Sequence, residues 1–168
     1  MQRTYNVLFL CTGNSARSIM AEAIMNKRGQ GRFVAYSAGS HPAGQVNPDA
    51  LIQIELAGLS TKTLRSKSWD EFSLPDSPKM HFVFSVCDKV AGEQCPVWPG
   101  QPLTAHWGIP DPAMVTGDEA SREKIMSQAF QQLTRRIDLF CHLPIDKLDR
   151  MTLKSELDAI GRLQGATD

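Results

Sequence analysis

A cysteine and an arginine separated by five small residues are the first residues of this sequence whose spacing could do chemistry. Residues 7–18 read VLFLCTGNSARS, so that Cys11 follows an apolar run and Arg17 follows the loop. Small residues allow successive backbone N–H groups to turn toward one point and bind an anion, and the N-terminus of a following helix adds to the positive field. The planar guanidinium of Arg17 fits two oxygens of a tetrahedral oxyanion at once. The segment therefore predicts a thiol held against a bound oxyanion.

Nucleophilic attack by Cys11 is the chemistry that this loop predicts. The positive field should lower the pKa of Cys11 from its usual value of about 8.5, which would make it a thiolate at neutral pH. Ser18 is expected to donate a hydrogen bond to the sulfur. The predicted oxyanion-binding residues are Thr12, Gly13, Asn14, Ser15, Ala16, Arg17 and Ser18. The alternative is a buried cysteine at a strand end and an arginine that pairs elsewhere.

Two further cysteines lie where they could react with Cys11. Cys87 follows the apolar run 82–86, and Cys95 comes eight residues later. Parallel strands end at one edge of a sheet, so Cys87 could approach Cys11. Eight extended residues span about 26–29 Å whereas a disulfide needs Cα atoms about 4.4–6.8 Å apart, so the segment 88–94 must curl if Cys95 is to reach Cys87. The alternative for Cys87 is inert packing at the end of a strand.

Asp111 is the candidate general acid. It lies between Pro110 and Pro112, on a rigid turn after a predicted strand, where its carboxyl could be held over the oxyanion and protonate the departing oxygen. An Asp-Pro turn is commonly structural only. The combination with Cys11 and Arg17 favours the catalytic interpretation.

The hydrophobic pattern predicts the elements that position these residues. Strands are expected over 5–10, 33–37, 81–86 and 103–107, and helices over 18–28, 47–58, 68–72 and 119–139. Strands that alternate with helices indicate an α/β fold with a four-stranded parallel sheet flanked by helices, which binds ligands at the carboxyl ends of its strands. We expect a single domain over residues 1–142 and a helical C-terminal extension over 143–168, with its helix at 149–161.

Composition excludes several classes of function. The 168 residues carry 18 Lys+Arg and 18 Asp+Glu, so no overall charge recruits nucleic acid or a membrane surface. No apolar run reaches the length of a membrane span, and no signal peptide is evident, which predicts a cytoplasmic protein. Four cysteines are then expected to be reactive or buried rather than a disulfide framework. No metal site is predicted, because neither the cysteine nor the histidine spacing fits a ligand set.

The motifs together resemble the arsenate reductases that share the low-molecular-weight tyrosine phosphatase fold, which is Rossmann-like. The resemblance covers about residues 4–140 and rests on LCTGNSARS at 10–18, MAE at 20–22, YSAG at 36–39, VNP at 46–48, Cys87, CP at 95–96, HWG at 106–108 and DPA at 111–113. It implies that Cys11 attacks arsenate while Arg17 and the loop hold the oxygens and Asp111 protonates the leaving one. Cys87 would then attack Cys11 and release arsenite, and Cys95 would form the final disulfide with Cys87.

The resemblance also implies how the cycle is completed. Two thiols that become a disulfide supply the two electrons that arsenate needs, so no tightly bound cofactor is expected and the electrons come from a thiol donor. Phosphate and sulfate would act as analogues of arsenate, and the function would be arsenic detoxification. The segment from Cys87 to Cys95 is one residue longer than in thioredoxin-coupled relatives, which leaves thioredoxin and glutaredoxin with glutathione both open as the reductant.

Some relatives bind a stabilising monovalent cation, and Asn14, Glu22 and Ser37 correspond to ligand positions there. No acidic residue follows near residues 66–68, so no such ion is predicted. Selectivity for arsenate over phosphate, the oligomeric state and the role of the C-terminal extension stay open. Cys141 is expected to be a packing residue.

Two other functions compete with arsenate reduction. A low-molecular-weight protein tyrosine phosphatase would use Cys11, Arg17 and Asp111 alone, but the segment 113–115 is Ala-Met-Val rather than aromatic, and Cys95 would have no role. A non-catalytic oxyanion or redox sensor would form a Cys11–Cys87 disulfide that alters binding to a partner. It would show reversible oxidation without turnover.

Overall fold

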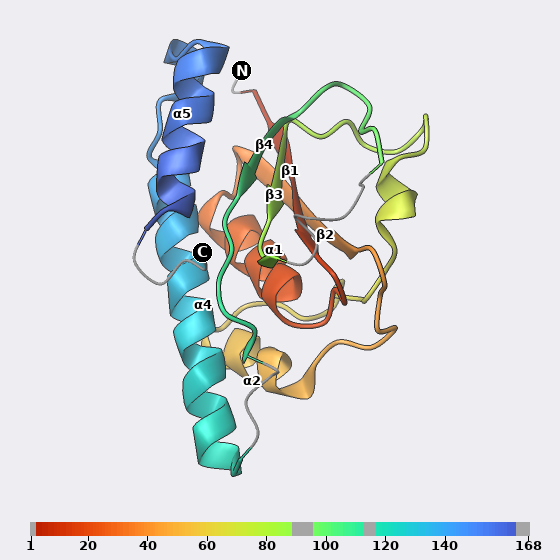
Figure 1. Cartoon of the computed structure of the whole chain (residues 1–168), viewed down its shortest axis with the longest axis vertical. Coiled ribbons are helices and arrows are strands. Elements are labelled where there is room, and N and C mark those ends of the chain that lie inside the picture. Colours follow the sequence, from red (N-terminus) through yellow and green to blue (C-terminus); the bar gives the residue numbers. More distant parts are fainter. Residues whose placement is uncertain (1–2, 89–95, 113–116, 164–168) are drawn as a thin grey trace.

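A four-stranded parallel sheet forms the centre of the protein in a computed structural model that describes residues 3–88, 96–112 and 117–163 (Figure 1). The strands are β1 (Tyr5–Cys11), β2 (Phe33–Gly39), β3 (Phe82–Ser85) and β4 (Leu103–His106), in the order β2-β1-β3-β4. The predicted α/β class and four-stranded parallel sheet are therefore confirmed. Cys95 and the segment 113–115 lie outside the described residues.

Strand β1 is central because its residues are apolar on both faces. Val7, Leu8 and Phe9 have no exposed surface, as expected of a parallel strand covered on both sides. The register places Cys11 opposite Gly39 on β2, and Leu10 opposite Ser85 on β3. The carboxyl ends of β1 and β3 therefore meet at one edge of the sheet, which is where Cys11 and Cys87 leave it.

The helices begin and end close to the residues that the sequence predicts. They are α1 (Arg17–Arg28), α2 (Pro48–Leu56), α4 (Glu119–Cys141) and α5 (Arg150–Gly161), with short 3-10 helices η1 (Trp69–Phe72) and η3 (Ile145–Lys147). Proline at the first position and an Asn47 cap define the start of α2. Among the described residues, no helix combines the length and the apolar character needed to cross a bilayer.

Aromatic packing joins the sheet to α4. The rings of Phe84 and Trp107 stack with centroids 3.8 Å apart, and Phe140 of α4 meets both rings edge-on. Helix α1 buries Ile19 and Ile24 in the same core. This packing fixes the direction in which α1 leaves the loop after Cys11.

Helix α5 lies against β4, and in Figure 1 it continues the column formed by α4. The indole Nε1 of Trp107 donates to the carbonyl of Leu157 at 3.0 Å. A Cβ at Gly161 would lie 2.1 Å from the carbonyl oxygen of His106, so glycine permits this close approach. The helix expected over 149–161 is present and is capped by Asp149. The boundary at residue 142 stays a prediction.

Candidate active site

The loop between β1 and α1 directs three of its carbonyl groups toward the segment after β2. These carbonyls accept backbone N–H groups of that segment at 2.8–2.9 Å: Thr12 from His41, Gly13 from Ala43, and Ser15 from Asn47. Within the described ranges, the N–H groups of residues 14–16 have no backbone acceptor. N–H groups without a backbone acceptor are what an anion-binding loop requires.

Asn14 holds the turn of this loop. Its backbone is left-handed, with φ of 45°, and its side chain is fully buried. The amide Nδ2 donates to Ser18 Oγ at 2.8 Å and to Ser37 Oγ at 3.0 Å, while Oδ1 accepts from the backbone N–H of Lys67 at 2.9 Å. Asparagine tolerates this conformation better than most residues, and the buried side chain locks it. Ser18 Oγ is the acceptor in this contact with Asn14, and its hydrogen bond to the sulfur of Cys11 stays a prediction.

The N-terminus of α1 carries no side-chain cap. Ala16 occupies the cap position, and the first turn contains no acidic residue. By contrast, α2, α4 and α5 are each capped by an Asn or Asp side chain. The first N–H groups of α1 and the positive end of its dipole therefore face the loop, ready for an anion.

The thiols of Cys11 and Cys87 are in hydrogen-bond contact beneath this loop. Both residues are buried, with 5% and 2% of their surface exposed. Cys87 Sγ also accepts from the backbone N–H of Thr12 at 3.3 Å and lies 3.5 Å from Thr12 Oγ1. The fold thus brings together two cysteines that are 76 positions apart in the sequence numbering. Two adjacent thiols are the arrangement from which a disulfide can form.

The pKa of Cys11 is raised well above the usual value for a thiol, which corrects the prediction of a thiolate at neutral pH. The hydrogen bond with Cys87 and burial raise it, while the charge of Arg17 and the backbone N–H of Gly13 lower it. The prediction weighed only the positive field of the loop. The tertiary structure adds a second sulfur and removes water, and both disfavour the charged form.

Arg17 and Asp111 meet at the rim of the loop. Arg17 Nη1 donates to the carbonyl of Ile109 at 3.1 Å, and Nη2 lies 3.4 Å from Asp111 Oδ2. The side chain of Arg17 is 11% exposed and that of Asp111 is 36% exposed. The structure therefore places Cys11, Cys87, Arg17 and Asp111 around one loop. The pairing also shows that the carboxyl lies beside the guanidinium that would hold the oxyanion.

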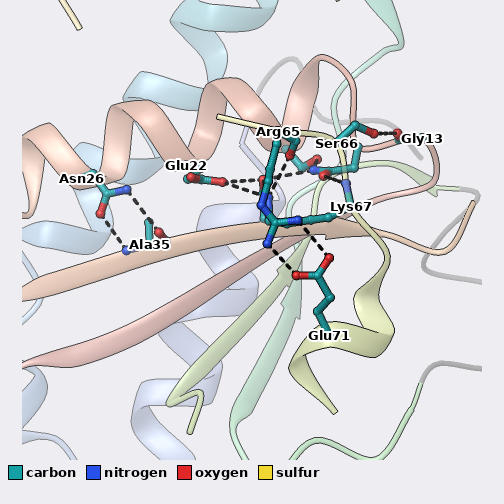
Figure 2. Close-up of polar contacts among 11 residues, drawn as sticks. Gly13, Glu22, Asn26, Ala35, Arg65, Ser66, Lys67 and Glu71 are labelled. Atoms are coloured by element: carbon teal, nitrogen blue, oxygen red, sulfur yellow. Dashed lines mark hydrogen bonds and ion pairs between the residues drawn. The ribbon is translucent and has the colours of Figure 1, made fainter. Parts of the chain in front are cut away.

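The segment 65–68 packs behind the loop, a role that the sequence did not predict. Ser66 Oγ donates to the carbonyl of Gly13 at 3.2 Å, and the ammonium of Lys67 lies beside Glu22 (Figure 2). The backbone of Gly39 donates to the carbonyl of Lys67 at 3.0 Å. A polar run in a region without periodic hydrophobics resembles any surface loop, so no local pattern marks it.

Possible metal ligands and Cys141 are the last site predictions to compare with the described residues. No group of three or more His, Cys, Asp or Glu residues in the described part of the chain is arranged to hold a metal ion. Burial raises the pKa of Cys141 to about 11, against the opposing charge of Arg32. Cys141 is thus a neutral thiol away from the loop, as expected of a packing residue.

Comparison with known proteins gives consistent results. An arsenate reductase of Halalkalibacterium halodurans is 32% identical over 134 residues, which is 80% of this chain and 93% of that protein. A solved arsenate reductase in the phosphate binding state matches with a TM-score of 0.67 and 24% identity over 82% of this chain and 97% of that one. A thioredoxin-dependent arsenate reductase of Corynebacterium glutamicum has a TM-score of 0.53 and 22% identity, over 82% of this chain and 64% of that one.

The family comparison covers the sheet, the loop and helices α1, α2 and α4. The model of the low molecular weight phosphotyrosine protein phosphatases matches residues 6–150, a range that holds Cys11, Arg17, Cys87 and Asp111. The chain therefore belongs to the low molecular weight phosphotyrosine protein phosphatase family.

Proposed function

We propose that this protein reduces arsenate to arsenite, with Cys11 as the nucleophile and Cys87 as the thiol that displaces the arsenic. The observation that carries the proposal is the contact between the two thiols beneath an open anion-binding loop. Hydrolysis of a phosphate ester needs one nucleophilic cysteine and water, whereas reduction of As(V) needs two electrons from a pair of thiols. The names of the arsenate reductase relatives support the same choice.

In the binding step, the unpaired N–H groups of the loop and the guanidinium of Arg17 hold the arsenate oxygens. A guanidinium carries five N–H donors, so its contacts with Ile109 and Asp111 leave donors for a bidentate interaction with the oxyanion. The uncapped N-terminus of α1 adds its partial positive charge. These groups also suit phosphate and sulfate, which have the same tetrahedral shape.

The raised pKa of Cys11 does not block the attack, because the substrate can take the proton. A thiol with HAsO₄²⁻ has the same charge as a thiolate with H₂AsO₄⁻, so the proton can pass to the bound dianion. Attack on arsenic then gives Cys11–S–AsO₃²⁻ and releases water. Asp111 lies beside Arg17, where its carboxylate can take the proton of one arsenate hydroxyl and pass it to the departing hydroxyl, so that both protons of the released water come from H₂AsO₄⁻.

Reduction takes place when Cys87 attacks the sulfur of Cys11. The S–As bond breaks, its electron pair stays on arsenic, and an S–S bond forms between the two cysteines. As(V) thereby becomes As(III) and leaves as HAsO₃²⁻, which takes up protons from water. The contact between the two thiols provides the short path that this step requires.

We propose further that Cys95 takes over the disulfide and presents a Cys87–Cys95 bond to a cytoplasmic thiol donor. Support comes from the position of Cys95 on the chain that follows Cys87, and from the thioredoxin-dependent arsenate reductase whose fold this chain shares. Thioredoxin is the first donor to test, with glutaredoxin and glutathione as the second.

The test is NADPH oxidation by the purified protein with thioredoxin, thioredoxin reductase and arsenate. Oxidation should depend on arsenate and be lost in Cys11→Ser and Cys87→Ser, while Cys141→Ser serves as the matched control and keeps activity. Cys95→Ser should release one equivalent of arsenite and then stall.

Three outcomes would contradict this scheme. Full arsenate turnover by Cys87→Ser would show that Cys87 does not displace the arsenic from Cys11. Strong cleavage of p-nitrophenyl phosphate with no arsenate-dependent NADPH oxidation would favour the phosphatase, and reversible Cys11–Cys87 oxidation without turnover would favour the sensor.

A further inference from the structure

A buried ion pair lies behind the loop between β1 and α1. This loop, residues 12–16, is called the oxyanion loop below. Lys67 Nζ is 3.6 Å from Glu22 Oε1, and the two side chains are only 6% and 8% exposed (Figure 2). Nζ also donates to the carbonyl of Arg65 at 2.9 Å and lies 3.5 Å from Ser37 Oγ. A lysine is rarely buried to this degree unless its charge is compensated. Because this pair is buried, its charges cannot serve to keep the protein surface soluble.

The pair reaches the loop through Ser37 and Asn14. Ser37 Oγ donates to Glu22 Oε1 at 2.6 Å and accepts from Asn14 Nδ2 at 3.0 Å. A hydroxyl has one proton, so donation to Glu22 obliges Ser37 to accept from Asn14. The charge on Glu22 thus fixes the direction of the hydrogen bond that holds the Asn14 amide.

The orientation of the Asn14 amide in turn fixes the conformation of the loop. With Nδ2 turned to Ser37 and Ser18, its Oδ1 is left to accept from the backbone N–H of Lys67. That orientation locks the left-handed backbone at Asn14, and it joins the loop to the segment that contains Lys67. The lysine therefore holds the loop twice, through its ammonium at Glu22 and through its backbone at Asn14.

Burial and charge show why the carboxylate needs the ammonium. Burial raises the pKa of Glu22, and the charge of Lys67 opposes that rise. Without the ammonium, a protonated Glu22 could donate to Ser37 and reverse the hydrogen bond to Asn14. An ionised Glu22 would instead keep a buried negative charge behind a site that binds anions, with the charge of Arg65 left to oppose it.

We propose that Lys67 and Glu22 are positioning residues that hold the oxyanion loop in its anion-binding shape through Ser37 and Asn14. The inference rests on the proposed function only in that the loop binds an oxyanion. Neither residue needs to touch the substrate. Burial lowers the pKa of Lys67 and the charge of Glu22 opposes that fall, so the cation that supports the loop is held by its partner.

Binding of inorganic phosphate by calorimetry, and the rate of Cys11 alkylation by iodoacetamide, test this without arsenate turnover. Lys67→Ala should raise the phosphate Kd about tenfold, because the loop loses contacts that hold its N–H groups in position. Lys154→Ala is the matched control, because it removes the same charge from an exposed pair with Asp158. It should leave the Kd unchanged.

Chemical rescue separates a cation requirement from general damage. Lys67→Ala leaves an oxygen-lined space where the ammonium was, so ammonium chloride should restore most of the lost phosphate affinity. Tetramethylammonium chloride at equal ionic strength should not, because the ion is too large and cannot donate hydrogen bonds. Ser37→Ala keeps the ion pair but cuts its link to Asn14, so it should weaken phosphate binding without rescue by ammonium.

The outcomes are distinguishable from failure of the proposed function. If the wild-type protein binds phosphate and a folded Lys67→Ala binds it equally well, the positioning role is wrong while arsenate reduction stands. If Lys67→Ala does not fold, wild-type affinity in Ser37→Ala overturns the inference. If the wild-type protein binds no phosphate, the oxyanion step of the proposed function fails first.

Discussion

The N-termini of α1 and α4 are built in opposite ways. Asp118 caps α4 by accepting from the backbone N–H of Ser121 at 2.8 Å, and Asp149 caps α5 in the same manner. Helix α1 begins at the oxyanion loop with Ala16 and no side-chain acceptor. Capped termini satisfy their N–H groups within the chain, whereas α1 leaves them for a ligand.

This difference teaches that the loop gives up local stability to keep a binding site. Unpaired N–H groups and a left-handed Asn14 both cost free energy in the empty protein. The buried contacts behind the loop, from Asn14 to Ser37 and Glu22, offset part of that cost. A bound oxyanion should offset more of it.

The largest effect we expect is stabilisation by phosphate. An oxyanion that supplies the acceptors missing at α1 should raise the free energy of unfolding by about 2.7 kcal/mol when phosphate is present at about 100 times its Kd. Thermal denaturation at constant ionic strength, with sodium chloride in place of phosphate, measures this. A Tm that ignores phosphate would mean that the open terminus of α1 is not an anion site.

The second largest effect should follow replacement of the Arg17 guanidinium. Arg17→Lys keeps the charge but loses the bidentate geometry, so the phosphate Kd should rise about 10- to 100-fold. Calorimetry checks this, with Arg28→Lys, at an exposed pair with Asp138, as the matched control. Equal affinity in Arg17→Lys would show that the loop N–H groups and helix dipole do the binding alone.

A smaller effect should follow the removal of the second sulfur. Cys87→Ala takes away the hydrogen bond that does most to raise the pKa of Cys11, so the pKa should fall and Cys11 should be alkylated faster at pH 7. Site-specific mass spectrometry after iodoacetamide, over a pH series, separates Cys11 from the other cysteines. A midpoint that stays in place would assign the raised pKa to burial alone.

The smallest effect should come from the capped helices. Asp118→Ala should lower Tm modestly without any change in phosphate affinity, because the cap lies at α4. The backbone hydrogen bond from Ser121 lowers the pKa of Asp118 in the folded protein, so its stabilisation is present above the unfolded value of about 3.9 and is lost as the pH falls through the folded value. The Tm difference from wild type should therefore shrink in acid. Loss of phosphate binding in Asp118→Ala would contradict the view that the capped terminus of α4 serves stability and the uncapped terminus of α1 serves binding.

The sequence predicted most of the framework because its patterns are local. The helix expected over 119–139 is Glu119–Cys141, and the strand expected over 5–10 is Tyr5–Cys11. Apolar periodicity and cap residues act within a few positions, so they can be read along the chain. The same is true of the small-residue loop that precedes Arg17.

Two features of the site were beyond local patterns. The raised pKa of Cys11 depends on the contact with Cys87 and on the degree of burial; the sequence predicts that Cys87 could approach, but not the effect of either on the pKa. The role of Lys67 depends on Glu22, its partner on α1, which is distant in the sequence.

The order of strand, loop and helix, and the presence of Cys11 and Arg17 at its centre, were determined by the sequence itself, since each depends on neighbours along the chain. Only the tertiary structure decided that Cys87 touches Cys11, and that Glu22, Ser37 and Lys67 meet behind the loop. Such contacts arise from the register of parallel strands and from burial, which join residues that are distant in the sequence and change the free energy of their charges.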